Sequence, residues 1–300
     1  MAATDYLKLG RVLSAKPMIG GDINHAFRLQ LESRRDGQDG AEETVFMKAN
    51  SRSNADFFRA EAAGLEAIAS MGILSVPKVL AWGTDDGQDN PLRGPCSFLL
   101  LEFLPPADKS ASYWEEFGQK LARLHLADTS HLVPGFGFPS DNYIGATVQI
   151  NRKTASWVDF FRECRLRPQF QMAASHFTRS QLADAESLLG RLEEFLPEPE
   201  RPSLLHGDLW GGNVHTGGDG RAWLIDPAAY CGHWEADLAM TRLFGGFPRK
   251  FYEGYNQVNP IPPGFSRRLD LYNLYHLLNH LNLFGASYLG QVLSTMASYT

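Results

Sequence analysis

Cysteine is scarce in this 300-residue chain, which has three cysteines, Cys96, Cys164 and Cys231. They lie far apart and form no Cys-x-x-Cys pair, which argues against a disulfide framework and against a structural zinc site. No apolar run approaches the ~20 residues that span a bilayer, and the first residues lack the basic start and long apolar core of a signal peptide. We therefore expect a cytoplasmic, reduced protein that does not contact a membrane.

Basic residues are also too few for a nucleic-acid-binding protein. The chain has 28 Lys and Arg against 34 Asp and Glu, for a net charge of −6, whereas phosphate-backbone binding needs a basic face. Hydrophobic residues make up 44% and charged residues 21%, which excludes a disordered chain, a coiled coil and a collagen-like fibre. At roughly 100–200 residues per domain, the length favours one large domain or two lobes.

The first hundred residues are rich in β-strand patterns. Residues 27–33 alternate apolar and polar side chains, and 44–49 form a second β-rich run after a polar, glycine-containing loop, which predicts a hairpin. A helix is predicted over 54–70, because Phe58, Ala62, Leu65 and Ile68 fall on one stripe. Two further strand-like runs follow at 76–83 and 97–104.

The pattern becomes helical after Pro105 and Pro106. Apolar residues at helical spacing predict helices over 111–127, 181–196 and 269–284, with short β signals near 204–205 and 222–226. We therefore predict an α+β protein with a lobe boundary at 104–106. Residues 1–104 would form a small, β-rich N-terminal lobe with one main helix, and residues 105–300 a larger, mostly helical C-terminal lobe.

The segment over residues 206–227 carries the most informative chemistry. Asp208 and Asn213 are five residues apart, and Asp226 ends a β-like run thirteen residues later. Phosphoryl transfer from ATP needs a carboxylate that accepts the proton of the attacking hydroxyl and oxygen ligands that hold Mg²⁺ on the phosphates. The Asp208-to-Asn213 spacing equals that of the kinase catalytic loop. Each residue alone would suit a glycine-rich turn, but the ordered set favours phosphoryl transfer.

A second group of residues lies in the N-terminal lobe. Gly20 and Gly21 form a turn that leads into a strand, where backbone N–H groups could approach phosphates closely. Lys48 lies in an apolar strand-like run, and Glu61 in the following helix could pair with it, as in a kinase small lobe. The alternative, in which Lys48 reaches solvent from an edge strand and Glu61 lies on an exposed helix face, stays open.

Two motifs, HGDLWGGN at 206–213 and LIDPAAYCGHWEADLAM at 224–240, resemble the aminoglycoside-phosphotransferase and choline-kinase superfamily. Within it the chain most resembles the fructosamine (ketosamine) kinases, through the stretches 135–151, 157–169 and 271–285. The resemblance runs from about Gly20 to Tyr288. It implies a bilobal protein-kinase-like fold that uses ATP and Mg²⁺.

The resemblance also implies roles for single residues. Asp208 matches the catalytic base, and Asn213 and Asp226 match the Mg²⁺ ligands. Lys48 matches the phosphate-contacting lysine, with Glu61 as its partner, and the glycine turn has no cysteine that could act as a redox-sensing thiol. The residues expected to bind ATP are Gly20, Gly21, Asn24, Lys48, Glu61, Glu102, Phe103 and Leu104, of which the last three match the adenine-binding hinge.

The implied substrate is a ketosamine, either a small molecule or a glycated protein, whose phosphorylation on a sugar hydroxyl would serve deglycation repair. The predicted substrate contacts are His206, Trp210, His233 and Glu235. His206 could instead orient the catalytic loop, and we favour a bracing role for Asp237. Asn142 and Gln149 could close the cleft or hold loop turns.

Two other functions compete with this interpretation. A different small-molecule kinase of the superfamily would act on an aminoglycoside, choline or methylthioribose, and choline would require an aromatic cage. A non-catalytic nucleotide-binding regulator is disfavoured, because Lys48, Asp208, Asn213 and Asp226 are all present. We expect a monomer or a weak dimer.

Overall fold

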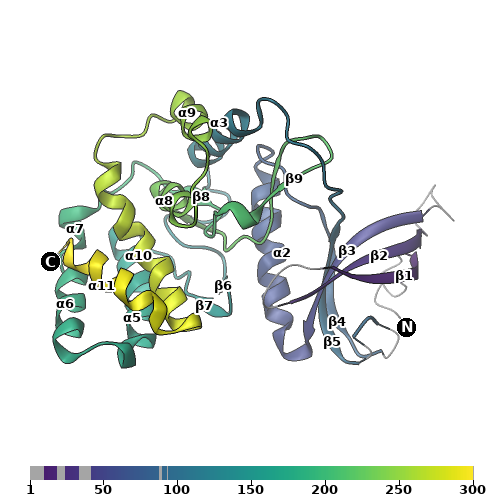
Figure 1. Ribbon diagram of the computed structural model, residues 1–300, viewed down its shortest axis with the longest axis horizontal. Helices are drawn as coiled ribbons and strands as arrows, with labels where there is room; N and C mark the ends of the chain where they lie inside the picture. Colours follow the sequence, from purple (N-terminus) through teal and green to yellow (C-terminus); the bar gives the residue numbers. More distant parts are fainter. Residues whose placement is uncertain (1–9, 19–23, 34–41, 88–89, 93, 300) are drawn as a thin grey trace.

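The computed structural model describes residues 10–18, 24–33, 42–87, 90–92 and 94–299. Within these residues five antiparallel strands form one sheet in the order β1-β2-β3-β5-β4, and the chain after β5 is mostly helical (Figure 1). The strands of this sheet are β1 (Gly10–Met18), β2 (His25–Ser33), β3 (Glu42–Ser51), β4 (Val79–Asp85) and β5 (Cys96–Glu102). The α+β, bilobal prediction is confirmed.

Alternation along β3 gives the sheet two different faces. Val45, Met47 and Ala49 are buried in a small core that the N-terminal lobe forms by itself. Successive side chains of a strand point to opposite faces, so Phe46 and Lys48 lie on the other face, where both line a cleft. The sheet thus presents a cation toward the rest of the protein without placing it in an apolar core.

Helix α2 (Ala55–Ser70) packs between the sheet and the helical lobe (Figure 1). The predicted stripe is confirmed, because Phe58, Ala62, Leu65 and Ile68 are all buried in the main core. Gly64 allows a close approach, since a Cβ there would lie 3.1 Å from Cγ of Pro227. The helix therefore packs directly against the chain segment that follows Asp226.

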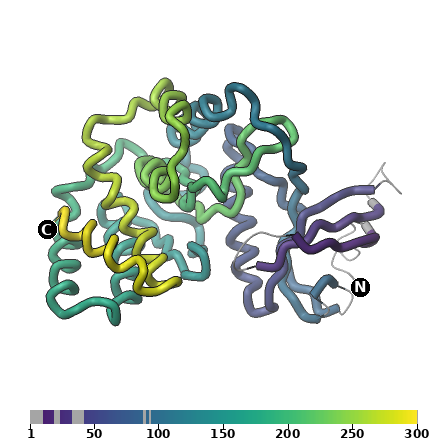
Figure 2. Tube along the Cα trace, in the orientation of Figure 1, coloured from purple at the N-terminus to yellow at the C-terminus, as the bar shows by residue number. Residues whose placement is uncertain are grey.

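The C-terminal lobe contains most of the helices, and the C-terminus lies at the end of the molecule opposite the sheet (Figure 2). Among the described residues, no helix combines the length and the apolar character needed to cross a membrane. A π-helix, η2 (Arg162–Leu166), separates α4 from α5. The α-helices are α3 (Tyr113–Leu126), α4 (Trp157–Phe161), α5 (Arg167–Met172), α6 (Arg179–Leu189), α7 (Leu192–Phe195), α8 (Glu235–Leu243), α9 (Arg249–Val258), α10 (Phe265–Phe284) and α11 (Leu289–Ala297).

Three short antiparallel pairs of strands connect these helices and position the loops of the site. They are β6 (Asn142–Ile144) with β7 (Thr147–Gln149), β8 (Ser203–Leu205) with β11 (Tyr230–Gly232), and β9 (Val214–Thr216) with β10 (Ala222–Leu224). Strands β8 and β9 flank residues 206–213, and their partners β11 and β10 flank residues 225–229. These pairs place both ends of residues 206–213 beside the segment that contains Asp226.

Most predicted elements are present, but the structure contains several that were not predicted. Among them are the strands β1 and β11, the hairpin β6–β7, and the helices α4, α5, α8 and α9. The helix predicted over 181–196 is two helices, because the backbone leaves helical conformation at Arg191, between α6 and α7. The division into lobes at 104–106 stays a prediction, and it falls in the connection between β5 and α3.

Two glycines allow the close packing of α3 against α9. A Cβ on Gly118 would lie 2.0 Å from the carbonyl oxygen of Phe251, and a Cβ on Gly254 would lie 2.2 Å from that of Glu115. Both distances are far below van der Waals contact, and both neighbours are backbone atoms that cannot rotate away. The two backbones can therefore approach this closely only at positions without a side chain.

We predict that Gly118→Ala lowers the free energy of unfolding by about 1–3 kcal/mol or more, because overpacking forces the backbones of α3 and α9 apart. Gly290→Ala is the matched control. It lies in α11 with open space around its Cβ position, so stability should rise by roughly 0.5–1 kcal/mol through the helix preference of alanine. Urea denaturation measures both changes. A Gly118→Ala protein as stable as the parent would contradict this account of the packing.

Candidate active site

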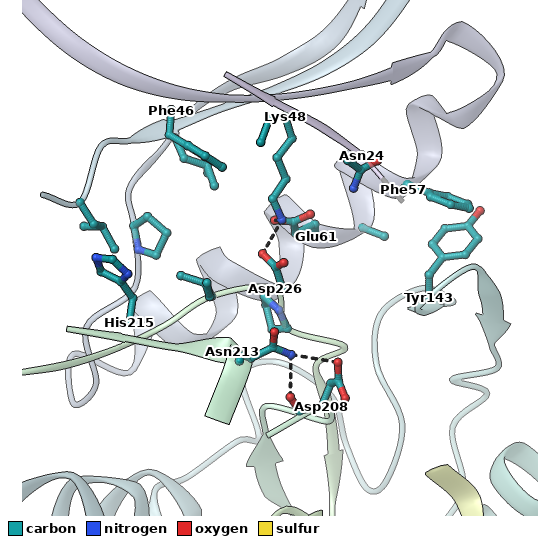
Figure 3. A pocket seen from close by; sticks show the side chains of 18 of the residues that line it. Asn24, Phe46, Lys48, Phe57, Glu61, Tyr143, Asp208, Asn213, His215 and Asp226 are labelled. Atoms are coloured by element: carbon teal, nitrogen blue, oxygen red, sulfur yellow. Dashed lines mark hydrogen bonds and ion pairs between the residues drawn. The ribbon is translucent and has the colours of Figure 1, made fainter. Parts of the chain in front are cut away.

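A cleft of about 720 Å³ lies between the sheet with α2 and the helical lobe. Its volume is within the range of small-molecule sites, roughly 300–1,000 Å³. Residues from both lobes line it, and among them are Lys48, Glu61, Asp208, Asn213 and Asp226 (Figure 3). The structure therefore brings together, in one cavity, the residues that the sequence placed in two separate groups.

Lys48 is the cation of the cleft, and it is only 8% exposed. Its Nζ donates to Oε1 of Glu61 at 2.7 Å and also to Oδ1 of Asp226. Burial by itself would lower the pKa of Lys48, but the two carboxylates outweigh it and raise the pKa above its usual value. The alternative in which Lys48 reaches solvent is thus wrong, and the lysine stays charged.

For Glu61, burial has a larger effect on the pKa than the neighbouring charge of Lys48. Burial raises its pKa to about 7, although the charge of Lys48 opposes the shift. The pair with Lys48 joins β3 to α2, and the second contact of Lys48 joins both to the C-terminal lobe. One amine therefore sets the relative positions of three parts of the chain.

The loop that carries Asp208 begins with a residue that has to be glycine. Gly207 has φ +80°, and a Cβ there would lie 2.1 Å from the carbonyl oxygen of Ala228. Only glycine adopts this conformation at no steric cost. The tight turn places Asp208 at the cleft directly after the buried strand β8.

Asp237 holds this turn in place through hydrogen bonds to its backbone. Its carboxylate accepts hydrogen bonds from the backbone N–H groups of His206 (2.7 Å) and Gly207 (2.9 Å), and its Oδ2 lies 3.3 Å from Nε2 of His125. Burial alone would raise the pKa of Asp237, but these hydrogen bonds and the nearby histidines lower it. The predicted bracing role of Asp237 is confirmed.

His206 links the two halves of the motif. Its Nε2 donates to the carbonyl oxygen of Ile225 at 2.9 Å, and its Nδ1 accepts from the backbone N–H of Asp208 at 3.3 Å. This assigns the neutral tautomer with the proton on Nε2, and burial lowers the pKa of His206. His206 fixes Asp208 relative to Ile225, the residue before Asp226, which agrees with the predicted orienting role.

Asn213, at the end of the loop, forms hydrogen bonds with Asp208. Its Nδ2 donates to the carbonyl oxygen of Asp208 at 2.8 Å and to its Oδ2 at 2.9 Å. Burial raises the pKa of Asp208 to about 7, the bond from Asn213 opposes the shift, and the charges of Asp226 and Asp237 add to it. A carboxyl group that titrates near neutrality is suited to accept a proton in the reaction.

Asp226 has an unusual backbone conformation, with φ +55°, the one positive φ outside glycine in the described part of the chain. Aspartate tolerates this region better than most residues, and such strain is often found at functional sites. The amide oxygen of Asn213 points toward Asp226 (Figure 3). Carboxylate and amide oxygens are hard donors that suit Mg²⁺, so these two side chains could hold a magnesium ion.

The end of β5 forms the other wall of the cleft. Glu102 donates its N–H to the carbonyl oxygen of Lys78 at 2.9 Å, and its carboxylate accepts from the N–H of Lys78 at 3.1 Å. Phe103 and Leu104 follow and line the cleft with it. The predicted hinge segment therefore lines the cavity, and the Glu102 carboxylate is held by Lys78, the residue before β4.

Of the remaining predicted residues that the structure describes, some line the cleft and others are buried elsewhere. Asn24 lines the cleft, where its Oδ1 accepts from Nδ2 of Asn50 at 2.7 Å, whereas Gly20 and Gly21 lie outside the described residues. Trp210 also lines the cleft. His233 and Glu235 are buried and are not among the residues described as lining it.

The surroundings of His233 and Glu235 explain their burial. Glu235 accepts from Nε and Nη2 of Arg268 at 2.7 and 2.5 Å, which is a paired, bidentate contact. Burial lowers the pKa of His233 to about 3, so this ring is neutral. Both residues are positioned as parts of the helical core.

The hairpin β6–β7 contributes residues whose roles the sequence left open. Asn142 donates to the carbonyl oxygen of Ala229 at 2.8 Å, and Gln149 donates to that of Ala228 at 3.0 Å. Asn142 and Gln149 thus hold the segment that follows Asp226, which favours the loop-holding alternative. Asn142 also lines the cleft.

Sequence reasoning missed an aromatic contact between the lobes and a buried guanidinium. The ring of Tyr143, in β6, lies 4.0 Å from that of Phe57, in α2, centroid to centroid (Figure 3). Arg165, in the π-helix, is fully buried, donates to Oδ1 of Asn151 at 2.8 Å and lies 3.9 Å from the ring centroid of Tyr230. No feature of the sequence singles out Arg165, because the charged residues Arg162, Glu163 and Arg167 lie close to it.

The fold and the site together define a phosphotransferase of the protein-kinase-like class. A ternary complex of an aminoglycoside phosphotransferase with AMP-PNP and hygromycin B has this fold, with a TM-score of 0.62, 18% identity and 99% of each chain covered. A closer structural match is a protein from Thermobifida fusca assigned as a fructosamine-3-kinase, with a TM-score of 0.80, 32% identity, and 99% and 98% of the two chains covered.

Sequence comparison identifies the family. The model of the family "Fructosamine kinase" matches residues 5–300, so the chain belongs to the fructosamine kinase family and is an ATP-dependent kinase of an alcohol group. A probable ketoamine kinase from Synechocystis is 40% identical, covering 93% of this chain and 87% of the relative. A chloroplastic protein-ribulosamine 3-kinase from Oryza sativa is 39% identical, covering 85% and 72%.

We predict that Asp237→Asn lowers the free energy of unfolding by about 3 kcal/mol, because a buried carboxylate with several donors loses one accepting oxygen. Asp184→Asn makes the same chemical change on the exposed face of α6 and should leave stability unchanged. Urea denaturation followed by circular dichroism measures both variants. Equal midpoints for the parent and Asp237→Asn would show that the carboxylate does not anchor the loop.

Proposed function

We propose that this protein uses ATP and Mg²⁺ to phosphorylate a sugar hydroxyl of a ketosamine, as a repair of glycated amines. The observation that carries the proposal is the position of Asp208 in the cleft, held by Asn213 beside the group of Lys48, Glu61 and Asp226. Family membership and the names of the relatives support the ketosamine as acceptor.

The nucleotide would lie along the sheet. Lys48 is the charged donor placed to contact its phosphates, and Glu61 keeps the amine in position. The backbone from Glu102 to Leu104 would meet the edge of the adenine, with Phe46 from β3 in the same cleft. Asn24 follows the predicted glycine turn, Gly20 and Gly21, which would cover the phosphates.

Mg²⁺ would be held by Asn213 and Asp226, whose oxygens fit a hard cation. When bound, the ion would neutralise charge on the phosphates of the nucleotide. Lys48 contacts Asp226 in the described structure, so the lysine also keeps this carboxylate beside the phosphate site. The strained backbone at Asp226 directs the side chain into the cleft.

Asp208 would accept the proton of the acceptor hydroxyl. The bond from Asn213 to Oδ2 fixes the orientation of the carboxylate, and the turn at Gly207 fixes its position. Holding one hydroxyl in line with the transferred phosphoryl group is a positioning effect that can supply several kcal/mol of the barrier reduction. Catalysis in this site would depend mainly on such positioning.

The acceptor would lie beside Trp210, two residues after Asp208. This ring lines the cleft and is 39% exposed, so it can stack on the apolar face of a sugar. His206, His233 and Glu235 were also predicted to contact the substrate, but their buried positions favour structural roles. Trp210 therefore remains the candidate among the four.

We predict that ribulose-lysine and fructose-lysine give saturable, Mg²⁺-dependent release of ADP, whereas lysine gives only background hydrolysis. In the same assay Asp208→Asn should fold and bind ATP but lose turnover by about 10²–10⁴-fold, because an amide cannot accept the hydroxyl proton. A panel with choline and an aminoglycoside completes the test. A higher kcat/KM for either of these would reject the ketosamine as the acceptor while leaving the kinase activity intact.

We predict that Asp226→Asn raises the Mg²⁺ concentration at half-maximal activity by about tenfold or more, because a formal negative charge is lost from the metal site. Asparagine tolerates the positive φ, so the backbone should be retained. Asn213→Ala should have a smaller effect on the metal requirement. Asp219→Asn, on an exposed turn, is the matched control. An unchanged Mg²⁺ dependence in both site variants would place the metal elsewhere.

A further inference from the structure

Arg165, in the π-helix η2, is a fully buried cation whose hydrogen-bond acceptors are neutral. Its Nη1 donates to two backbone carbonyl oxygens at 2.6 and 2.9 Å, and its Nη2 donates to Oδ1 of Asn151 at 2.8 Å. The neighbouring Arg162 and Arg167 each pair with a carboxylate, but Arg165 has no such partner among the described residues. Because an unpaired charge is unfavourable to bury, packing alone does not explain this residue.

Three aromatic rings surround the guanidinium and offset part of this cost. Its central carbon lies 4.5 Å from the ring centroid of Phe160, 3.9 Å from that of Tyr230 and 5.6 Å from that of Tyr275, distances at which a ring attracts a cation. Tyr230 is the first residue of β11 and directly follows residues 226–229. Arg165 therefore lies against the end of the segment that begins with Asp226.

Two amide side chains connect Arg165 to the same segment by hydrogen bonds. Asn151, whose Oδ1 accepts from Arg165, donates from Nδ2 to Oδ1 of Asn142 at 2.8 Å. Asn142 in turn donates from Nδ2 to the carbonyl oxygen of Ala229 at 2.8 Å. Both amides are buried, so water does not compete for these bonds. We call Asn151 and Asn142 the amide relay.

The charge of Arg165 determines which way each amide of the relay faces. An amide side chain can present either its oxygen or its NH₂ group to a neighbour, whereas a guanidinium has only donors. Asn151 must therefore turn its oxygen toward Arg165, and its NH₂ group then faces Asn142. Asn142 accepts with its oxygen and keeps its own NH₂ group for Ala229. One fixed cation thus leaves a correctly oriented donor at a carbonyl group close to Asp226.

We propose that Arg165 is a positioning residue that holds Asp226 in place for Mg²⁺ through the amide relay. The proposal rests on the proposed function, because it takes Asp226 as a metal ligand. The relay fixes Ala229 and the guanidinium lies on Tyr230, so the chain after Asp226 cannot shift to release its positive φ. Single turns of π-helix are frequent at functional sites, which agrees with the position of Arg165.

Two variants break the relay at different points. Asn151→Asp still accepts from Arg165 and supplies a counter-ion, so the protein should fold, but its second oxygen cannot donate to Asn142. It also loses a bond to the carbonyl oxygen of Ser140 at 3.1 Å. Arg165→Met removes the charge that orients the relay and leaves the bond to Ser140 possible, so an effect common to both variants belongs to the relay.

The matched control is Asn256→Asp, the same chemical change at an exposed position of α9. The side-chain oxygen that accepts from the N–H of Ile261 is retained there.

Calorimetry of AMP-PNP binding at increasing Mg²⁺, without an acceptor, measures the effect on the metal site. Both relay variants should need about tenfold more Mg²⁺ for half-maximal binding, close to the largest factor that one uncharged hydrogen bond contributes. Binding without Mg²⁺ should be unchanged, and Asn256→Asp should match the parent protein. In an Asp226→Asn background, Asn151→Asp should add little, because both changes act on the same ligand.

Hydrogen exchange of the backbone amides of residues 228–230 tests the relay without nucleotide or metal. Exchange should be faster in Asn151→Asp than in the parent protein, while the urea midpoint of the variant stays at the parental value. Exchange at the parental rate would reject the relay.

Three binding results would also overturn the proposal. They are a parental Mg²⁺ requirement in both relay variants, an equal loss of AMP-PNP binding with and without Mg²⁺, and full additivity of Asn151→Asp with Asp226→Asn. None of these measurements uses an acceptor. A failure to phosphorylate ketosamines would therefore reject the proposed function and leave this inference standing.

Discussion

The position of the Lys48 amine between two carboxylates is the interaction on which the rest of the site depends. Lys48 comes from the sheet, Glu61 from α2 and Asp226 from the helical lobe, so one buried cation aligns three parts of the chain. Removing either carboxylate would leave a poorly solvated charge, which is strongly unfavourable. The close contact of Gly64 with Pro227 depends on the same alignment, because it brings α2 against the chain just after Asp226.

A second, polar framework supports the loops around this cation. Asp237 holds the turn before Asp208, and Asn142 and Gln149 hold the carbonyl groups that follow Asp226. Since buried backbone groups are expensive to leave unpaired, these side chains determine a unique path for loops that have little regular structure. The positive φ of Asp226 persists because its neighbours on both sides are fixed.

The sequence was most informative where pattern and chemistry are local. The stripe of α2 follows from helical periodicity, and the order and spacing of Asp208, Asn213 and Asp226 predicted a common site, which agrees with their position in one cleft. Strand β1 was missed because Val12 and Leu13 are adjacent, which breaks the alternation, and because Pro17 argues against a strand except at the edge of a sheet, where β1 lies. The burial of Glu235 could not be foreseen because its partner, Arg268, is 33 residues away. The contact between Phe57 and Tyr143 likewise depends on packing between lobes.

The contact between Phe57 and Tyr143 joins the two lobes in addition to the connection from β5 to α3, the Lys48–Asp226 ion pair and the packing of Gly64 on Pro227. Both rings line the cleft, and Phe57 lies one helical turn before Glu61, on the same face of α2. A rotation of the lobes that widened the cleft on this side would have to separate the rings first. The pair therefore opposes a widening of the cleft on this side, because both aromatic faces would lose their contact with each other.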